Sequence, residues 1–443
     1  MCTINPSASL RINGERPSTT LRTALSERSE SNGRRRTIKF HTLGCKVNQY
    51  DTQSIRERFL ASGFREIAGS QKADFYLINT CTVTSSADQK SRMIIRRCIK
   101  ENPKAKVIVT GCLIKKDQAS LTKIKGIEFL VSKNFFPDGI TDFSGHTRAF
   151  LKVQDGCNNF CSYCKVPLVR GSSRSKLPEE ILRETKSLVN KGFKEIVLTG
   201  ICLGAYGKDL KLKVDLTGII SRLEKIEGLL RIRLSSIEAS DVSTKLINKM
   251  RVSQKLCRHL HIPIQSGDDY ILKKMNRSYT RKQYLNLIKK IKAKVPKVAI
   301  TTDVLVGFPG ESEDNFKNTV SLVKGIVPLK VHIFPYSKRE GTLAANFKPI
   351  IEPEIITERV RQFRNIEKEC SLKYRRQFLN QNLSLLVESR CKSNPAYWEG
   401  YSDNYIKVLV KSKCNLKNKL IFSKVVNVGK NETIVNFAGN YVL

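Results

Sequence analysis

The sequence is short of acidic residues and contains no long apolar run. Asp and Glu number 40 against 79 Lys and Arg, which gives a formal net charge of +39 and a pI of 9.9. No apolar stretch approaches the roughly 20 residues that span a bilayer, and no apolar signal-peptide core lies near the start. We therefore expect a cytoplasmic protein without membrane contact. The charge favours nucleic acid as a partner, although the Lys, Ile and Asn richness of AT-biased genomes would produce a similar excess.

Several common catalytic motifs are also missing. The sequence has no nucleophile elbow, no Walker-type phosphate loop and no paired metal-binding His. His259 and His261 alternate on a predicted strand, and we assign neither to catalysis. Thirteen Cys in 443 residues do not form a disulfide scaffold. In a reducing compartment, clustered thiols more often bind metal or react.

Three Cys stand close together at Cys157, Cys161 and Cys164, with Cys-x3-Cys-x2-Cys spacing. Three thiolates can hold three corners of a cubane iron-sulfur cluster, which usually takes four ligands, so one iron stays open to an exogenous group. Structural zinc is the alternative. It prefers two Cys pairs or a Cys pair with a His pair, and no second pair with that spacing lies nearby. The spacing therefore favours a cluster that takes part in chemistry.

A second set of Cys follows the predicted strands of residues 37–146. Strands are predicted over 37–42, 74–79 and 105–109, with helices over 51–61 and 86–100 between them. This alternation predicts an α/β domain with a parallel sheet. Cys45, Cys81 and Cys112 each come just after a strand, at the edge where open α/β sheets bind ligands. A free Cys is most often a small buried hydrophobe, but the shared position favours a second three-thiolate cluster.

Residues 147–376 alternate in the same way. Six strands are predicted over 149–154, 195–198, 231–234, 259–263, 299–306 and 330–334, before a long basic helix over 354–380. They predict a partial (β/α) barrel, whose ligands gather at the carboxyl ends of the strands. Polar and Gly-rich loops there favour a cofactor site. Its candidate residues are Gly200, Ser236, Glu238, Gln265, Gly307 and Glu311.

The two ends of the chain differ from this pattern. Residues 1–36 lack hydrophobic periodicity and are predicted to be a disordered basic tail. Residues 377–443 contain short β-rich runs that predict a small β-barrel, with six Lys and four aromatic residues that suit RNA. These are Lys407, Lys411, Lys413, Lys417, Lys419 and Lys424, with Tyr397, Trp398, Tyr401 and Tyr405. A solvated basic face with core aromatics is an equally weighted alternative.

These motifs together resemble the radical S-adenosylmethionine methylthiotransferases, in particular the branch that acts on N6-threonylcarbamoyladenosine in tRNA. HTLGCKVNQYDT (41–52), INTCTVT (78–84) and VTGC (109–112) resemble the amino-terminal cluster-binding domain of that family. GCNNFCSYC (156–164), HLHIPIQSG, DVLVGFPGE and HIFPYSKREGT resemble its radical core, and the terminal module resembles the TRAM RNA-binding domain. LGCKVN is similar to the threonylcarbamoyladenosine branch rather than to its relatives.

The resemblance implies four segments and two [4Fe-4S] clusters. The segments are a tail (1–36), a methylthiotransferase domain (37–146), a radical domain with its trailing helix (147–376) and a TRAM-like barrel (377–443). Cys157, Cys161 and Cys164 would bind the cluster that cleaves S-adenosylmethionine, with Tyr163 beside the adenine. Cys45, Cys81 and Cys112 would bind the cluster that delivers sulfur.

The reaction implied by the resemblance makes 2-methylthio-N6-threonylcarbamoyladenosine beside the anticodon. S-adenosylmethionine would serve as radical source and as methyl donor, with a flavodoxin- or ferredoxin-type electron donor and an unidentified sulfur donor. Two alternatives stay open. One is the same chemistry on isopentenyladenosine in tRNA, and the other is a non-catalytic RNA-binding protein with structural zinc.

Overall fold

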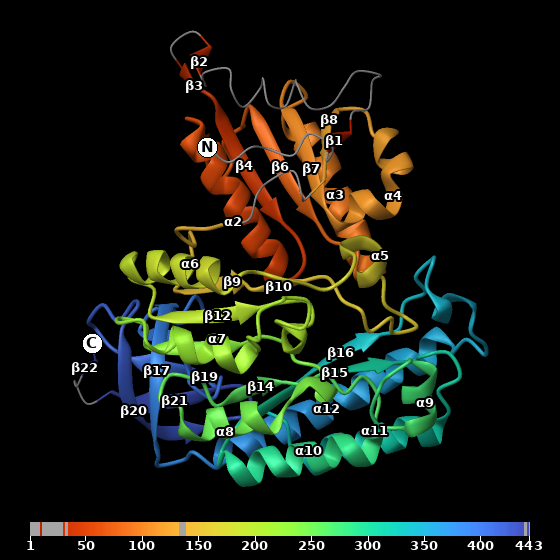
Figure 1. The fold of residues 1–443 in the computed structure, drawn as a ribbon, viewed down its shortest axis with the longest axis vertical. Helices are drawn as coiled ribbons and strands as arrows, with labels where there is room; N and C mark the ends of the chain where they lie inside the picture. The colour runs from red at the N-terminus through yellow and green to blue at the C-terminus, as the bar shows by residue number, and fades with distance from the viewer. Residues whose placement is uncertain (1–8, 11–29, 32–33, 133–138, 438–440, 443) are drawn as a thin grey trace. The chain divides into compact units, whose positions relative to one another are not determined.

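The computed structural model describes residues 9–10, 30–31, 34–132, 139–437 and 441–442 (Figure 1). The chain forms two compact units. Unit 1 contains Met1–Ser144, Gly156–Asn158 and Cys164–Ser172, and unit 2 contains the rest. Most of the predicted tail lies outside the described residues, where only the short strands β1 (Ser9–Leu10), β2 (Glu30–Ser31) and β3 (Arg34–Arg35) interrupt it. Within the described ranges, no helix has both the length and the apolarity to cross a membrane.

Unit 1 is built on the predicted parallel sheet. The strands β4 (Thr37–Thr42), β5 (Arg65–Glu66), β6 (Phe75–Thr80), β7 (Lys106–Gly111) and β8 (Ile127–Val131) lie in the order β5-β4-β6-β7-β8, with β1 antiparallel at the edge. All neighbours from β5 to β8 are parallel. The strand order reverses between β4 and β6, and ligands of open α/β sheets bind beyond the carboxyl ends at such a reversal.

Helices cover both faces of this sheet, as Figure 1 shows for α2 (Lys46–Ala61), α3 (Ser85–Glu101) and α4 (Cys112–Thr122). Phe59 of α2 packs in one cluster with Leu77, and Ile95 of α3 packs in another with Ile78. Successive strand residues point to opposite faces, so the unit has three layers. The predicted start of the first helix at residue 51 is wrong, because buried Val47 and Tyr50 extend its packed face.

Unit 2 contains the predicted partial barrel. Its strands are β9 (Arg148–Lys152), β12 (Glu195–Thr199), β13 (Arg231–Leu234), β14 (His259–His261), β15 (Ala299–Val306) and β16 (Lys330–Pro335). β9, β12 and β13 form one parallel set and β14, β15 and β16 another. An isolated parallel bridge between Ser236 and His261 connects the two sets. The prediction of six parallel strands in an open barrel is confirmed.

Helices alternate with these strands along the chain. They are α6 (Pro178–Asn190), α7 (Leu216–Leu223), α8 (Thr244–Val252), α9 (Asp269–Lys274), α10 (Arg281–Lys294) and α11 (Glu313–Ile326). The predicted long basic helix is α12 (Pro353–Arg376).

The carboxyl-terminal module is a closed barrel of five strands. They are β17 (Asn382–Arg390), β18 (Tyr397–Ser402), β19 (Lys407–Lys411), β20 (Leu420–Val428) and β21 (Thr433–Asn436), with β22 (Tyr441–Val442) added to β20. Pairing of β17 with β20 closes the barrel. Its core is one hydrophobic cluster with Ala299 and Leu329 of the partial barrel and Tyr374 of α12. The module is therefore packed as part of unit 2.

Trp398, Tyr401 and Tyr405 of this module serve packing, and the predicted role as an RNA-stacking platform is wrong for Trp398. Trp398 is only 5% exposed and belongs to the shared core. Tyr401 and Tyr405 stack with their centroids 5.1 Å apart, and the Arg148 guanidinium lies 4.6 Å from the Tyr401 ring. These residues lie on or beside β18, whose Glu and Gly obscure the strand pattern.

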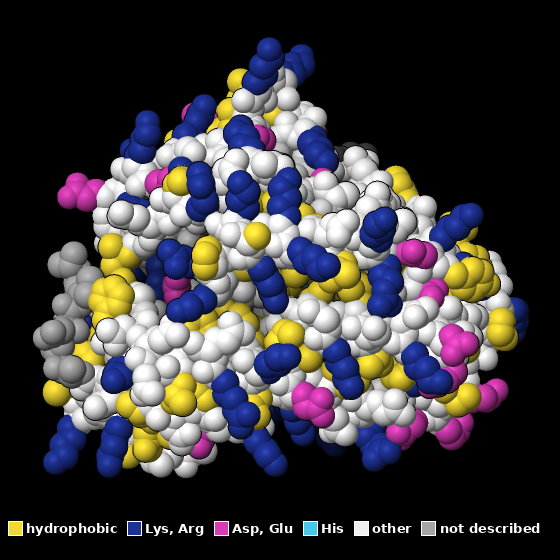
Figure 2. Space-filling model, turned by 90° about the horizontal axis from the view of Figure 1, so that it is seen from below, with side chains coloured by type: hydrophobic (Ala, Val, Ile, Leu, Met, Phe, Trp, Pro, Cys, Tyr) yellow, Lys and Arg dark blue, Asp and Glu magenta, His cyan; other side chains and the backbone are white. Residues whose placement is uncertain are grey.

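The Lys residues of the same module are exposed as predicted, at positions 407, 411, 413, 417, 419 and 424. Figure 2 shows that Lys and Arg side chains are spread over the face it presents rather than gathered into one patch. The positive charge therefore offers contacts to an extended polyanion.

Candidate functional site

Cys45, Cys81 and Cys112 lie at the carboxyl ends of β4, β6 and β7. Cys45 is the N-cap of α2, and Cys112 is the first residue of α4. Cys45 and Cys112 each follow a Gly with a φ of +98°, a conformation that L side chains rarely adopt. A Cβ on Gly44 would lie 2.7 Å from the Cβ of Cys81, and one on Gly111 would lie 2.4 Å from the Thr80 carbonyl oxygen. Two glycine turns thus close around the end of β6.

The strand register and the two glycine turns place the three thiols at one edge of the sheet. The pKa of Cys81 is raised to about 11, mainly by burial and in smaller part by the thiols of Cys112 and Cys45, against the opposing effects of the Val83 amide and of Arg170. Cys81 and Cys112 are buried, whereas Cys45 is exposed. Three mutually repelling thiolates are stabilised when cations bind among them. The donor set therefore fits an iron-sulfur cluster.

Asn48 connects the turns that carry these thiols. Its side-chain amide donates to the carbonyl oxygens of Leu43 at 2.7 Å and Thr80 at 3.0 Å. Its side-chain oxygen accepts from the Arg170 guanidinium, which also lies 3.5 Å from Asp51. Asn48 is not among the site residues predicted from the sequence, although its position three residues after Cys45 in LGCKVN was a usable signal.

The loop that carries Cys157, Cys161 and Cys164 follows β10 (Gln154–Asp155) and leads into α5 (Val166–Arg170). Its two ends belong to unit 1. The amide of Cys157 donates to the Gly171 carbonyl oxygen at 3.1 Å. The backbone at Gly156 is so close to Ser172 that a Cβ would lie 2.0 Å from its carbonyl oxygen. α5 packs on α4, the helix that begins at Cys112.

The middle of the loop, Asn159–Tyr163, belongs to unit 2. The amide of Ser162 donates to the Met275 carbonyl oxygen at 3.0 Å, and its hydroxyl donates to that of Lys274 at 2.7 Å. The Ser162 carbonyl oxygen accepts from the Ala344 amide at 2.8 Å. Short loops after α9 and β16 thus hold the loop at the carboxyl ends of the barrel strands.

Arg277 is a site residue that was not predicted from the sequence. Its guanidinium donates to the Cys161 sulfur at 3.3 Å and pairs with the Glu238 carboxylate. Burial raises the pKa of Glu238, while Arg277 opposes this shift. A buried cation beside a sulfur ligand stabilises the thiolate that binds iron. The surroundings of Cys161 therefore fit a cluster ligand.

The predicted cofactor residues lie along the carboxyl edge of the barrel. Gly200 follows β12, and a Cβ there would lie 2.8 Å from the Gln154 side-chain oxygen. Ser236 pairs with His261. Gln265 has a left-handed φ of +64°, and its amide donates to the Asp303 carbonyl oxygen at 2.8 Å.

Glu311 and Gly307 form an internal contact in the turn after β15. The Glu311 carboxylate accepts from the Gly307 amide and from the Arg359 guanidinium of α12, both at 2.8 Å. Burial raises its pKa, which Gly307 and Arg359 oppose. Glu311 thereby holds the shape of this turn. Tyr163 packs edge-on against Phe308 in the same turn, with centroids 6.4 Å apart.

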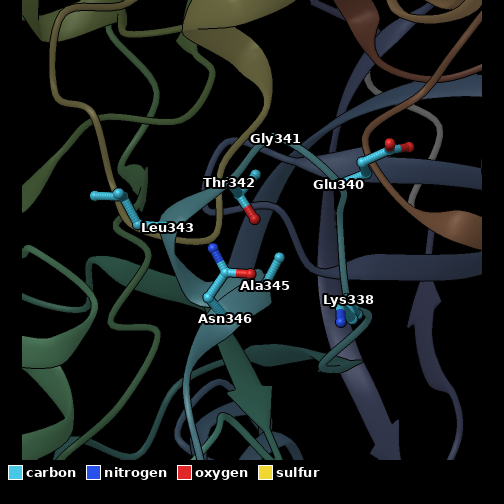
Figure 3. A pocket seen from close by; sticks show the side chains of 7 residues that line it. All are labelled: Lys338, Glu340, Gly341, Thr342, Leu343, Ala345 and Asn346. Carbon is cyan, nitrogen blue, oxygen red and sulfur yellow. The ribbon is translucent and has the colours of Figure 1, made fainter.

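A pocket of about 410 Å³ lies in the segment after β16 (Figure 3). Its lining residues are Lys338, Glu340, Gly341, Thr342, Leu343, Ala345 and Asn346. Thr342 and Asn346 turn toward one another in Figure 3, whereas Leu343 points away. None of the lining residues was predicted as a cofactor contact. The hydrogen bond from Ala344 to Ser162 connects the segment to the Cys loop.

Two described protein families match this chain. A family described as the radical SAM superfamily matches residues 151–323, and one described as uncharacterized protein family UPF0004 matches residues 37–132. Threonylcarbamoyladenosine tRNA methylthiotransferase MtaB of Bacillus subtilis is 38% identical, over 89% of this chain and 94% of the relative. The chain belongs to the radical S-adenosylmethionine methylthiotransferase family.

Members of this family named for two different tRNA nucleosides are similar to this chain. A second MtaB relative, from Chlamydia pneumoniae, is 39% identical over 80% of this chain and 87% of its own length. The tRNA-2-methylthio-N(6)-dimethylallyladenosine synthase of Carboxydothermus hydrogenoformans is 33% identical over 87% of this chain and 95% of its own. As a member of this family, the protein uses iron-sulfur and S-adenosylmethionine cofactors.

Proposed function

We propose that this protein methylthiolates carbon 2 of N6-threonylcarbamoyladenosine beside the anticodon of tRNA. The product is 2-methylthio-N6-threonylcarbamoyladenosine. The observation that carries the proposal is the placement of Cys45, Cys81 and Cys112 at one edge of the unit 1 sheet, separate in sequence from the Cys157–Cys164 loop. One three-thiol group suffices for radical generation, whereas sulfur insertion requires a source of sulfur. The similarity to the relatives named MtaB favours the threonylcarbamoyl substrate.

The chemistry explains the need for these cofactors. Carbon 2 of adenine carries an unactivated aromatic hydrogen, which acid-base catalysis does not usefully remove near neutral pH. The bound cofactors supply the radical, the sulfur and the methyl group. We assign one [4Fe-4S] cluster to Cys157, Cys161 and Cys164 and a second to Cys45, Cys81 and Cys112.

The protein's own residues hold and tune these ligands. Arg277 hydrogen-bonds the Cys161 sulfur, and Asn48 ties together the turns that carry Cys45 and Cys81. Tyr163 with Gly200, Ser236, Glu238, Gln265, Gly307 and Glu311 forms the proposed S-adenosylmethionine site or its supporting shell. Exposed Lys residues of the carboxyl-terminal barrel provide phosphate contacts for tRNA.

The reaction also needs partners. We propose a low-potential electron donor of the flavodoxin or ferredoxin type and a separate donor that replaces the consumed sulfur. The proposed location is the cytoplasm, because the proposed substrate, tRNA, is found there. The proposed domain limits are 37–146, 147–376 and 377–443.

Mass spectrometry of tRNA nucleosides tests the substrate. Cells without the gene should lose 2-methylthio-N6-threonylcarbamoyladenosine and accumulate its unthiolated precursor, and the intact gene should restore the product. Loss of the methylthio group from the dimethylallyl nucleoside instead would support the substrate of the Carboxydothermus hydrogenoformans relative.

Anaerobic purification tests the cofactors. We expect a brown protein with about eight iron atoms, as two cubane clusters require, which cleaves S-adenosylmethionine on reduction. A colourless protein with zinc, no iron and no cleavage would support the non-catalytic alternative.

A further inference from the structure

The interior of the partial barrel contains a cluster of three polar side chains to which the sequence assigned no role. It consists of His261 on β14, Asp303 on β15 and His332 on β16. His261 Nε2 lies 3.2 Å from an Asp303 carboxylate oxygen, and the His261 and His332 rings are 5.6 Å apart. One polar atom from each of the three residues lies within 4.8 Å of the others. We call these residues the His-Asp-His group.

Strand geometry places this group on the concave face of the barrel. The Thr302 hydroxyl lies 3.4 Å from the hydroxyl of Tyr284 on α10, so Thr302 points toward the outer helices. Successive strand residues alternate, so Asp303 points inward. The register pairs Asp303 with His332 on β16. Three neighbouring parallel strands therefore contribute one polar residue each at one level.

The neighbouring residues show where the His-Asp-His group lies between the amino and carboxyl ends of the barrel strands. At the amino ends of the strands, the His259 ring lies 4.6 Å from that of Tyr405, so the terminal barrel packs against this end. Toward the carboxyl ends, Ser236 pairs with His261, and the Gln265 amide donates to the Asp303 carbonyl oxygen. The His-Asp-His group is thus directly below loops that hold proposed cofactor contacts.

The group is both oriented and accessible. The Thr301 hydroxyl lies 2.9 Å from His261 Nδ1 and 2.9 Å from His259 Nε2, which fixes the His261 ring. The side chains of His261 and Asp303 are 17% and 20% exposed, and His332 is exposed. A ligand inside the barrel would therefore meet polar groups that are already held in place.

We propose that the His-Asp-His group binds the polar N6 substituent of the substrate adenosine, which rests on the function proposed above. A threonylcarbamoyl group has a carboxylate, a hydroxyl and urea N–H groups. His332 presents a ring nitrogen to its carboxylate or hydroxyl, and Asp303 accepts from an N–H or hydroxyl. His261 holds Asp303 in place, because its Nε2 lies 3.2 Å from one Asp303 carboxylate oxygen and its Nδ1 lies 2.9 Å from the Thr301 hydroxyl. A dimethylallyl group makes no such hydrogen bonds and would displace water from these polar groups without offering them a hydrogen-bond partner. Sites of that kind reject the analogue strongly.

RNA binding measures this selectivity without turnover. The cluster-containing enzyme, unreduced, is titrated with anticodon stem-loops that carry either N6-threonylcarbamoyladenosine or N6-dimethylallyladenosine, and fluorescence anisotropy reports the affinity. We expect the unaltered enzyme to prefer the first RNA by about tenfold or more. His332→Ala and Asp303→Asn should each reduce this preference at least several-fold while binding of the dimethylallyl RNA changes little.

Lys330→Ala is the matched control, because Lys330 is an exposed residue of the same strand. It should retain the preference. Asp303→Asn preserves the side-chain shape. If thermal melting shows that His332→Ala is unstable, the Asp303→Asn variant alone decides the test. Variants that keep the full preference, or an unaltered enzyme that binds both RNAs equally, would overturn the proposal.

Two further measurements separate competing explanations. Nucleoside mass spectrometry on the unaltered enzyme tests the proposed function separately from the binding site. If neither RNA yields a methylthio product, the proposed function is wrong, whatever the variants show. Titration of the cluster-containing enzyme with Co²⁺ tests the group as a metal site. One equivalent bound without RNA and lost in His332→Ala would overturn substrate binding in favour of a metal.

Discussion

The two groups of three Cys are built in different ways. Cys157, Cys161 and Cys164 lie on one loop, so their proximity follows from chain connectivity. Cys45, Cys81 and Cys112 come from three separate strand ends, and the parallel sheet brings them together. The first group is a local motif, whereas the second exists only when unit 1 is folded.

This difference also appears in what surrounds each group. The sheet-edge thiols lie between glycine turns that a single Cβ would disrupt, and Asn48 joins two of the turns. In the Cys157–Cys164 loop, Arg277 donates to the Cys161 sulfur and Ser162 bonds to Lys274, Met275 and Ala344. A preformed edge suits the sulfur-delivering cluster that we propose for it, because such a cluster would have to keep its ligands. A loop supported by barrel residues suits a cluster that works beside a bound cofactor.

The largest expected effect comes from removing a thiol from each group. Cys161→Ala should abolish 5′-deoxyadenosine formation, whereas Cys81→Ala should retain part of it and still block thiolation. Each variant should contain about four fewer iron atoms. Iron analysis and mass spectrometry of both products make the measurement. Equal loss of both activities in a folded Cys81→Ala protein would contradict separate roles for the two groups.

A smaller backbone change should damage only the sheet-edge group. Gly44→Ala introduces a Cβ 2.7 Å from Cys81 at a φ of +98°, which costs about 1–3 kcal/mol in backbone strain before the clash is counted. We expect loss of most iron from the sheet-edge group, with 5′-deoxyadenosine formation retained. Iron content and the cleavage assay check this result.

Gly69→Ala is the control for Gly44→Ala. Gly69 has a φ of +68°, but no atom lies within 4 Å of the position that a Cβ would take, so this change adds strain without a clash. If both variants retained full iron, the close approach of Gly44 to Cys81 would not be needed for iron binding by the sheet-edge group.

An intermediate effect is expected from Asn48→Asp. This change keeps an acceptor for Arg170 but removes the amide that donates to Leu43 and Thr80. The new carboxylate would face two carbonyl oxygens near the thiols, and loss of such buried hydrogen bonds costs about 1–3 kcal/mol. We expect weaker retention of the sheet-edge iron, measured as faster iron loss to a chelator.

Asn102→Asp provides the comparison for Asn48→Asp. Asn102 also donates to a backbone carbonyl oxygen, that of Ala73, but it lies at the far end of α3 from Cys81. The Asn102→Asp variant should lose iron to the chelator at the same rate as the unaltered protein. An equal acceleration in both variants would indicate general destabilisation of unit 1.

The smallest effect should come from Arg277→Met. Removing the cation and its hydrogen bond to Cys161 makes the reduced, more negative cluster less favourable. The reduction potential of the loop cluster should fall by roughly 20–90 mV, equivalent to about 0.5–2 kcal/mol, while the sheet-edge cluster is unaffected. A redox titration followed by electron paramagnetic resonance would detect the shift. An unchanged potential would limit Arg277 to pairing with Glu238.

Much of the fold could be predicted from the sequence, because strand and helix patterns are local. The strands at Thr37–Thr42, Arg231–Leu234 and Ala299–Val306 have the predicted limits. The start of α2 was wrong because burial of Val47 and Tyr50 depends on the sheet beneath them. The strand β18 carries polar and small residues, which hide the apolar alternation by which a strand is predicted.

The sequence by itself determined which residues carry the thiols and where the strands that position them end. Only the tertiary structure decided that Arg277 reaches Cys161, that Trp398 is buried in a shared core, and that His261, Asp303 and His332 meet. The physical reason is that spacing along a chain fixes neighbours within an element. Contacts between elements depend on sheet register and packing, to which residues far apart in sequence contribute jointly.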